Sequence, residues 1–251
     1  MRVSTILFDL FGTLLFVDGD KLPHAELDGK RVIMTIPGID ELLAQLTPQV
    51  SLDRFFECLV EVSVEMGKEK RRTHREIPSV DRFTRTLRAL ELDGDIDVVA
   101  QAMSRRHMGS LAAAVTCPDD RVALLTELAD RYRIGLISNF DHGLTARALL
   151  AHHGLNELFE TIVISDDAGV CKPGAAIFAR ACTDLGVELG ECLYVGDSHD
   201  ADVHGATGAG LHALWVDSSD DPHAPALGKI GDVRELPGWL EAEVGVEGAD
   251  G

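Results

Sequence analysis

The architecture of this chain depends on the stretch Ser4-Thr5-Ile6-Leu7-Phe8-Asp9-Leu10-Phe11-Gly12-Thr13. Its apolar first half, which starts at Val3, is typical of a buried strand in a parallel sheet. The strand ends at the carboxylate of Asp9. Because ligands bind at the carboxyl ends of strands in open α/β sheets, Asp9 lies where a functional group is expected. A strand followed by an ordinary turn has the same local pattern, so the interpretation depends on later segments.

Length and charge limit the possible classes of protein. With 251 residues the chain accommodates one large α/β domain, or a core with a smaller inserted domain. The 23 Lys and Arg residues against 42 Asp and Glu residues give a net charge of −19. Because so negative a surface repels a phosphate backbone, we expect no nucleic-acid partner.

Cysteine usage and hydropathy indicate the compartment. The five cysteines are odd in number and form no C-x-x-C pair, so we predict neither a disulfide framework nor a zinc knuckle. Asp9 interrupts the apolar stretch 3–17, and no small-residue cleavage site follows it, which argues against a signal peptide. No segment reaches the ~18 apolar residues that span a bilayer. We therefore expect a cytoplasmic protein without a membrane partner, either a monomer or a homodimer.

The periodicity of the chain predicts two structural units. Residues 38–114 carry apolar side chains at about 3.6-residue spacing with charged opposite faces, and no strand pattern intervenes. From Cys117 onward helices alternate with strands, the strands being predicted at 133–137, 161–164, 191–195 and 212–216. This alternation predicts a doubly wound parallel sheet with right-handed crossovers. We expect an α/β core over 1–16 and 115–251, with an inserted helical cap domain over 17–114 that covers the site. The alternative is that these helices belong to the main layer.

Polar side chains end three of the predicted strands. Asp9, Ser138-Asn139 and Asp197 follow strands, and Lys172 precedes a helix. The segment 197–202 holds three carboxylates in six residues, and with Asp9 at the same edge so much negative charge requires a cation. A few oxygen ligands with room for water suit Mg²⁺. Lys172 and the Ser138 hydroxyl then serve as donors for an anionic group such as a phosphate.

In this order the segments resemble the four motifs of the haloacid dehalogenase superfamily. The first motif, usually Asp-x-Asp-Gly-Thr, corresponds to residues 9–13, and the second, a Ser or Thr that ends a strand, to Ser138. Lys172-Pro173 matches the third motif, and Gly196 through Asp202 match the fourth, Gly-Asp-x-x-x-x-Asp. The resemblance covers nearly the whole chain, and the insertion after the first motif resembles the family's C1 helical cap.

The resemblance implies a Mg²⁺-dependent phosphatase that acts on a small phosphorylated metabolite. Asp9 would be the nucleophile that forms an aspartyl-phosphate. The implied metal ligands are Asp9, the Phe11 carbonyl and Asp197, with Asp202 supporting the ion directly or through water. Ser138 and Lys172 would hold the phosphoryl group and Thr13 would fix the first loop. The implied phosphate- or substrate-binding residues are Phe11, Gly12, Thr13, Ser138, Asn139 and Lys172.

One position departs from the pattern of the phosphatases. Phe11 stands where they carry the Asp that protonates the leaving group and later activates water, a role worth roughly 10²–10⁴-fold in rate. Haloacid dehalogenases carry an aromatic residue there, but their fourth motif lacks the carboxylates that this chain retains. We therefore expect metal-dependent phosphoryl chemistry. The alternatives are 2-haloacid dehalogenation, phosphonate cleavage and a catalytically impaired binding protein.

Several other charged residues are secondary candidates. Phosphonate cleavage would need a cap lysine, Lys68 or Lys70, that points inward. His24 is a candidate substitute acid, and His199 lies within the fourth motif. Four arginines of the insertion are candidates for binding substrate anions, with surface solvation the alternative: Arg72, Arg75, Arg105 and Arg106.

Overall fold

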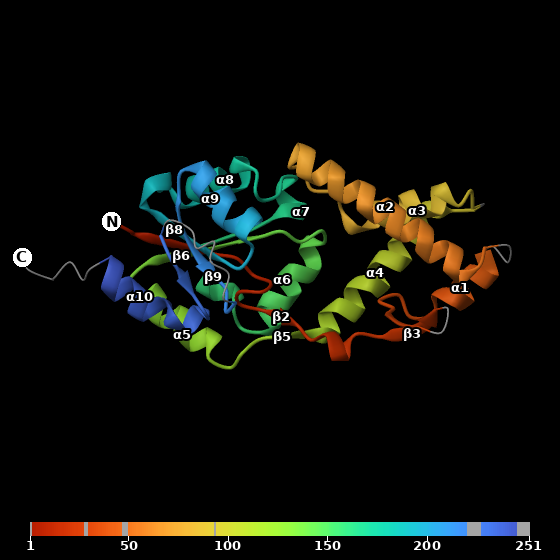
Figure 1. Ribbon diagram of the computed structural model, residues 1–251, viewed down its shortest axis with the longest axis horizontal. Helices are drawn as coiled ribbons and strands as arrows, with labels where there is room; N and C mark the ends of the chain where they lie inside the picture. The colour runs from red at the N-terminus through yellow and green to blue at the C-terminus, as the bar shows by residue number, and fades with distance from the viewer. Residues whose placement is uncertain (1, 28–29, 47–49, 93, 220–226, 245–251) are drawn as a thin grey trace, which may run out of the picture.

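A computed structural model describes residues 2–27, 30–46, 50–92, 94–219 and 227–244. Figure 1 shows a sheet with helices on both faces, and a group of helices, α1 to α4, that forms a second lobe beside it. The sheet has six strands in the order β10-β9-β8-β1-β6-β7, and every pairing between them is parallel. The strands are β1 (Thr5–Phe8), β6 (Arg133–Ser138), β7 (Thr161–Ile164), β8 (Cys192–Gly196), β9 (His212–Val216) and β10 (Lys229–Ile230).

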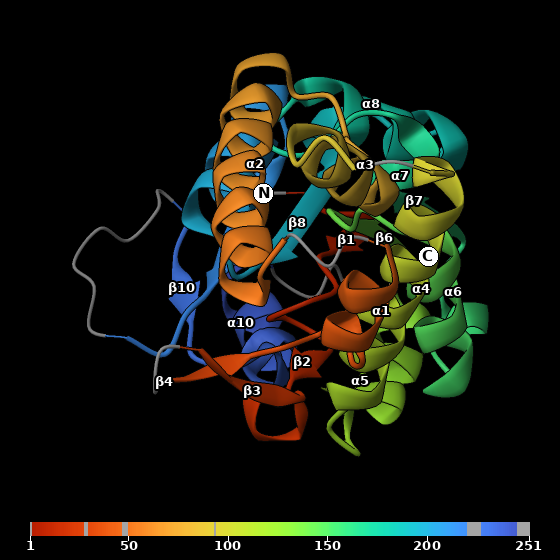
Figure 2. The same ribbon diagram turned by 90° about the vertical axis from the view of Figure 1, so that its right-hand side faces the viewer.

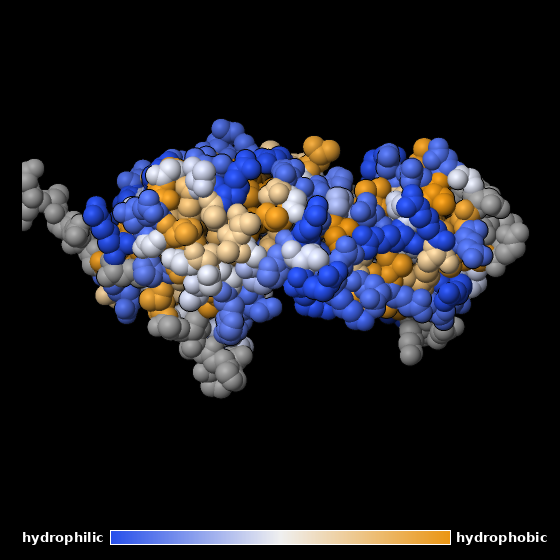
Figure 3. All heavy atoms as spheres, turned by 90° about the horizontal axis from the view of Figure 1, so that it is seen from above, coloured by the Kyte–Doolittle hydropathy of each residue, from blue (hydrophilic) through white to orange (hydrophobic). Residues whose placement is uncertain are grey.

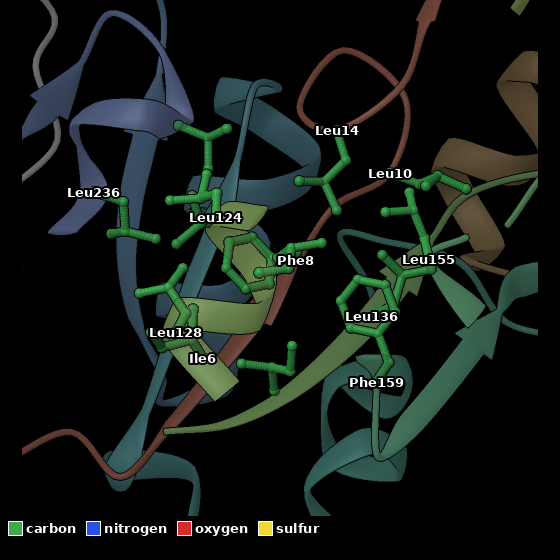
Figure 4. Close-up of a cluster of buried hydrophobic side chains, with 14 of the residues drawn as sticks. Ile6, Phe8, Leu10, Leu14, Leu124, Leu128, Leu136, Leu155, Phe159 and Leu236 are labelled. Atoms are coloured by element: carbon green, nitrogen blue, oxygen red, sulfur yellow. The ribbon is translucent and has the colours of Figure 1, made fainter. Parts of the chain in front are cut away.

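Two hydrophobic layers enclose the sheet, because successive side chains of a strand point to opposite faces. Ile6 and Phe8 of β1 pack into one layer and Leu7 into the other. The first layer, shown in Figure 4, includes Leu124 and Leu128, together with Leu236. Its helices are α5 (Arg121–Ala129), α6 (Gly143–His152) and α10 (Leu236–Glu243), and those of the second layer are α8 (Ala175–Leu185) and α9 (Gly205–Ala209). The predicted doubly wound parallel sheet is confirmed.

The sequence pattern predicted five of the six strands of the main sheet. Strands β7 and β9 have the predicted bounds, and β1, β6 and β8 differ from prediction by one or two residues. Strand β10 was not predicted because it has only two residues, too few to show a period. Short helices complete the core: η2 (Asn156–Leu158), α7 (Ser165–Ala168), η3 (Leu189–Glu191), the π-helical turn η4 (His199–His204) and η5 (Val233–Glu235).

The segment 17–114, which we call the insert, has its own hydrophobic cluster. Phe55 of α2 and Phe83 of α3 are buried in it with Met103 of α4. Ser51 caps α2 by accepting a hydrogen bond from Arg54 N, and Asp95 caps α4 in the same way from Val98 N, as N-cap side chains do. The insert contains η1 (Gly19–Lys21), β3 (His24–Leu27), β4 (Lys30–Ile33), α1 (Ile39–Leu46), α2 (Leu52–Thr73), α3 (Ser79–Ala89) and α4 (Ile96–Ala114).

A two-stranded ribbon joins the insert to the core. The chain leaves the core through β2 (Phe16–Val17) and returns through β5 (Val115–Thr116), and these strands pair antiparallel. In Figure 2 the helices α1 to α4 lie in front of the sheet, so the insert faces the edge at which β1 ends. A connection of only two short strands is the kind of segment that can act as a hinge between two parts of a protein. Within the residues described above, no helix has the length and apolarity needed to cross a membrane.

Candidate active site

The ends of three adjacent strands bring the predicted residues together. β1 lies between β6 and β8, so Asp9 after β1 has Ser138 at the end of β6 on one side and Asp197 after β8 on the other. The backbone N–H of Asp9 donates to the carbonyl of Val195 at 2.9 Å, which continues the β1–β8 pairing as far as Asp9. Ser138 and Asp197 follow Asp9 by 129 and 188 positions in the sequence. They lie beside it because their strands flank β1 in the sheet.

Lys172 lies at the centre of the site. Its Nζ is 2.5 Å from Oδ1 of Asp9 and 2.7 Å from Oδ1 of Asp202, and it also donates to the hydroxyl of Tyr194 at 2.7 Å and the carbonyl of Ile137 at 3.1 Å. The side chains of Lys172 and Asp202 are almost completely buried. A buried ammonium is stable only when paired, and these contacts compensate it fully. The side chain is consequently fixed in place.

The acidic cluster is only partly neutralised. Ligand oxygens of Asp9, Asp197 and Asp202 all lie within 4.8 Å of one another. Three carboxylates against the single ammonium of Lys172 leave two uncompensated negative charges in a largely buried place. Oxygen ligands in small number suit Mg²⁺, and a divalent cation supplies the missing charge. The residues present therefore fit the metal that the family motif implies.

The pKa values of the cluster report the same imbalance. Burial raises the pKa of Asp9 to about 7; the charges of Asp202 and Asp197 add to this effect and Lys172 opposes it. Burial followed by the charge of Asp202 also raises the pKa of Asp197. Burial lowers the pKa of Lys172, but the carboxylates of Asp202 and Asp9 outweigh it, so that pKa is raised. Lys172 therefore stays cationic, whereas Asp9 is only partly ionised near neutral pH, and added positive charge would favour its carboxylate form.

Gly12 lets the first loop approach the fourth motif. Its φ of +94° lies in the left-handed region, and a Cβ there would lie 2.2 Å from Oδ2 of Asp197. Only glycine fits, on grounds of both backbone conformation and space. The turn is closed by backbone hydrogen bonds from Leu14 N to the Leu10 carbonyl and from Gly12 N to the Leu15 carbonyl, at 2.9 and 2.8 Å.

Two buried hydroxyls in the site have no partner among the described residues. They are Oγ of Ser138 and Oγ1 of Thr13, and both residues are about 1% exposed. A buried hydroxyl without a hydrogen bond is costly, so each is a candidate for contact with a ligand. The family resemblance implied that Thr13 fixes the first loop. Its hydroxyl makes no hydrogen bond to the described residues of that loop.

Asn139 has a different role from the one predicted. Its Nδ2 donates to the Lys172 carbonyl at 2.9 Å, and its Oδ1 accepts from Lys172 N at 2.8 Å. Both ends of the amide are thus used to hold the backbone of the site lysine. The residue lines the adjacent cleft, but its polar atoms are engaged in positioning Lys172.

Phe11 is packed against the second motif. Its ring stacks on that of Phe140, with centroids 4.7 Å apart and an interplanar angle of 25°. Phe140 N donates to Oγ of Ser165, and Ser165 Oγ donates in turn to Glu76 of the insert at 2.5 Å. The position that carries an acid in related phosphatases is here part of an aromatic contact.

The insert is fastened to the core beside the site. Arg82 of α3 pairs with Asp141 at 2.7 Å, and the Asp141 carbonyl accepts from Ser79 N. The carboxylate of Glu76, 1% exposed, pairs with Lys70 at 2.5 Å as well as with Ser165. These contacts connect the loop that follows Ser138 to two helices of the insert. No periodicity in the sequence could have revealed them.

A cleft of about 370 Å³ lies between the insert and the core, and we call it the inner cleft. Lys172 and Asn139 contribute to its core wall, and Ser63, Lys70 and Arg71 of α2 to the opposite wall. Arg71 has no acidic partner among the described residues. Small-molecule ligands are typically held in concave spaces of this size.

Of the secondary candidates, Lys70 lines the inner cleft and the others do not. Lys68 pairs with Glu65 on the surface, and His24 contacts Arg31 in the β3–β4 hairpin. The His199 ring packs on that of Trp215, whose Nε1 donates to the Asp197 carbonyl. The four arginines proposed for substrate anions are exposed, and none lines the inner cleft: Arg72, Arg75, Arg105 and Arg106.

Comparison with known proteins shows the family. A family model described as haloacid dehalogenase-like hydrolase matches residues 3–210. The chain therefore belongs to the haloacid dehalogenase-like hydrolases, and it is a hydrolase. This membership agrees with the four motifs and with the arrangement of Asp9, Ser138, Lys172 and Asp197.

Two similar relatives are named as phosphatases. N-acylneuraminate-9-phosphatase of Mus musculus is 35% identical over 133 residues, 49% of this chain and 52% of that protein, so the match spans about half of its length. Glyceraldehyde 3-phosphate phosphatase of Methanopyrus kandleri is 29% identical over 216 residues, 85% of this chain and 84% of that protein.

Solved structures share the fold. A 2-haloacid dehalogenase from Pseudomonas syringae pv. Tomato DC3000 superposes with a TM-score of 0.65 at 23% identity, covering 96% of this chain and 99% of that one. A HAD phosphatase from Thermococcus onnurineus gives a TM-score of 0.63 at 24% identity, covering 97% and 99%. Both kinds of chemistry occur on this fold, so the choice between them depends on the residues of the site.

Proposed function

We propose that this protein is a Mg²⁺-dependent phosphatase that acts on small phosphorylated metabolites through a covalent intermediate on Asp9. The observation that carries the proposal is the cluster of three carboxylates around Lys172, which lacks two positive charges, with the unpartnered hydroxyl of Ser138 beside it. Relatives named as phosphatases support the same reaction class.

The metal site follows from the oxygen donors. Asp9, Asp197 and the Phe11 carbonyl would hold Mg²⁺, and Asp202 would support it. When bound, the ion neutralises the carboxylates and the phosphate oxygens, so that an anionic nucleophile can approach an anionic substrate. Asp202 already accepts from Ser198 N at 2.9 Å and pairs with Lys172, so its part is to orient the lysine as well as to add charge.

Asp9 acts as the nucleophile. One of its carboxylate oxygens forms a bond to phosphorus while the bond from phosphorus to the leaving oxygen breaks, and the leaving group departs with that electron pair. The ammonium of Lys172 and the hydroxyl of Ser138 stabilise the negative charge on the transferring phosphoryl group. Water then attacks the phosphorus, which releases inorganic phosphate and restores the Asp9 carboxylate.

Phe11 determines which leaving groups are suitable. Stacked on Phe140, it supplies no proton to the departing oxygen. Esters whose leaving group is stable as an anion, such as aryl and acyl phosphates, therefore react faster than alkyl phosphates. Solvent protonates the product after it leaves.

Dehalogenation is the second candidate, and the aromatic side chain at position 11 favours it. A carboxylate that attacks carbon needs no metal, whereas Asp197 and Asp202 add negative charge that only a cation relieves. Phosphonate cleavage through a Schiff base on Lys70 is disfavoured, because its ammonium is paired with buried Glu76. A binding protein without catalysis is the remaining possibility.

The insert would act as a lid over the site. It is joined to the core by the β2–β5 ribbon, which lies at the predicted boundaries of the insertion and would serve as the hinge near Phe16 and Val115, and it is fastened by the Arg82–Asp141 pair. Closure excludes water from the phosphoryl group and strengthens the electrostatic contacts within the site.

A panel of aryl, acyl and alkyl phosphates and 2-haloacids, assayed with Mg²⁺ and with a chelator, tests this function. We expect phosphate release that needs Mg²⁺ and is lost in Asp9→Asn. Halide release in the presence of the chelator would establish the dehalogenase instead. Absence of both reactions, with no effect of Asp9→Asn, would point to a binding protein.

A further inference from the structure

We infer that the substrate of this site is a phosphate ester whose leaving group ends in an extended apolar body, which lies in a second cleft of the insert. This inference rests on the proposed phosphatase function. The second cleft, which we call the apolar cleft, has a volume of about 420 Å³. Its walls include Ile33 of β4 and four residues of α2: Phe56, Leu59, Val60 and Val64.

The two clefts adjoin, because they share two lining residues. Ser63 of α2 and Arg82 of α3 line both the inner cleft and the apolar cleft. A molecule whose phosphate lies beside Lys172 can therefore extend past Ser63 and Arg82 without leaving the protein surface. Each cleft alone has a volume in the range of small-molecule sites, so a three-carbon phosphate would leave most of this space empty.

One face of α2 carries the pattern that such a molecule requires. Phe56, Val60, Ser63, Gly67 and Arg71 recur at steps of three and four residues, so they share one side of the helix. The first two line the apolar cleft, and the last two line the inner cleft. The face thus changes from apolar to cationic over about 16 Å between Val60 and Arg71, at a rise of 1.5 Å per residue.

The apolar end of this face is exposed. Val60 is 59% exposed, Val64 49% and Ile33 53%, whereas the hydrophobic cluster of the insert is buried nearby. Figure 3 shows hydrophobic residues at the surface of the insert among hydrophilic ones. Grouped exposed aliphatic side chains beside a reactive site mark a binding groove.

The polar groups of the apolar cleft are already satisfied. His107 Nδ1 and Thr35 Oγ1 are 2.7 Å apart, and the guanidinium of Arg82 is paired with Asp141. Ser63 Oγ donates to the Leu59 carbonyl at 2.7 Å, so each of these polar side chains has a partner within the protein, and the aliphatic lining favours an apolar occupant. The occupant is anchored at the other end by its phosphate.

A series of para-alkylphenyl phosphates tests the inference, because lengthening the alkyl group leaves the acidity of the phenol almost constant. Phosphate release is measured for phenyl, para-butylphenyl and para-hexylphenyl phosphate with Mg²⁺. We expect kcat/KM to rise about two- to fourfold per added methylene while the chain lies in the cleft. Equal kcat/KM values across the series would overturn the inference.

Two matched variants test whether the apolar cleft causes the increase of kcat/KM with alkyl chain length. Val60 and Val98 are both exposed valines on helices of the insert, at 59% and 58%; Val60 lines the apolar cleft, and Val98 lines neither of the two clefts. Val60→Lys should reduce the ratio of hexylphenyl to phenyl kcat/KM to near one, whereas Val98→Lys should keep the wild-type ratio. The same ratio in both variants would contradict the inference. So would loss of a dimer in Val60→Lys alone, because a second copy of the chain would then cover this face.

Binding separates this inference from the proposed function. If no ester releases phosphate, the phosphatase function fails, and calorimetry of the same three esters with Mg²⁺ still measures the apolar contribution. Affinity that increases with chain length in wild type and not in Val60→Lys supports the apolar subsite. Affinity that is independent of chain length overturns it.

Discussion

The rings of Phe11 and Phe140 are stacked, with centroids 4.7 Å apart, and this contact joins the first motif to the second. Phe11 follows Asp9 by two residues, and Phe140 follows Ser138 by two. The side chain at position 11 therefore contributes to packing between the loops that follow two neighbouring strands. An aromatic pair of this kind contributes about 0.5–1.5 kcal/mol beyond the burial of its area.

Replacing Phe11 with Asp should restore an acid to the site. We expect Phe11→Asp to raise kcat/KM for alkyl phosphates at least tenfold relative to aryl phosphates, within the roughly 10²–10⁴-fold range of general acid catalysis. Phe11→Leu removes the ring without adding an acid and serves as the control. If both variants leave the aryl-to-alkyl ratio unchanged, leaving-group protonation does not limit this enzyme.

Removal of Asp197 should abolish the metal site. Calorimetry should detect Mg²⁺ binding to the wild type at millimolar concentration and none to Asp197→Asn, because the cluster loses a ligand and one negative charge. Asp217→Asn is the matched control, since Asp217 pairs with Lys229 and is not part of the cluster. Equal binding by Asp197→Asn and wild type would show that the ion, if bound, lies elsewhere.

Replacing Ser138 with Ala should increase the stability of the protein and decrease its activity. Its buried hydroxyl has no partner among the described residues, so Ser138→Ala should raise the free energy of unfolding by about 1 kcal/mol. The same variant should raise KM for phosphate esters and lower kcat, because a donor to the phosphoryl group is lost. Urea unfolding and steady-state kinetics measure the two effects. A destabilised variant with normal kinetics would assign Ser138 to the core alone.

Stability of the insert should depend on pH through His107. Burial lowers the pKa of His107 to about 4 from an ordinary value of 6.5. Between these values the unfolded chain binds the proton and the folded chain does not, so stability falls as pH drops from about 6.5 towards 4. The urea midpoint should therefore decrease between pH 7 and pH 5 less steeply in His107→Asn than in wild type. Parallel pH profiles would contradict this.

Sequence patterns predicted the sheet and its polar strand ends because both are local. Asp9, Ser138 and Asp197 each follow an apolar run, and parallel topology is enough to bring them to one edge. Lys172 could be assigned through its place in the motif order. Its near-complete burial, with four hydrogen-bonding or ionic partners, became visible only in the folded chain.

The remaining features of the site depend on contacts between distant segments. Glu76 meets Ser165 across 89 residues, and Arg82 meets Asp141 across 59, with no repeating pattern that connects them. The predicted strand 191–195 gives no functional role to Tyr194, although the Tyr194 hydroxyl accepts a hydrogen bond from Lys172. Such pairs are set by how the insert sits on the core, which propensity and periodicity do not encode.

Mass spectrometry after acid quench tests the central role of Asp9 most directly. Protein mixed with Mg²⁺ and an aryl phosphate should carry the mass of one phosphoryl group on the peptide that contains Asp9, and Asp9→Asn should carry none and release no phosphate. Phosphate release by Asp9→Asn at the wild-type rate, with no adduct on that peptide in either protein, would contradict the account.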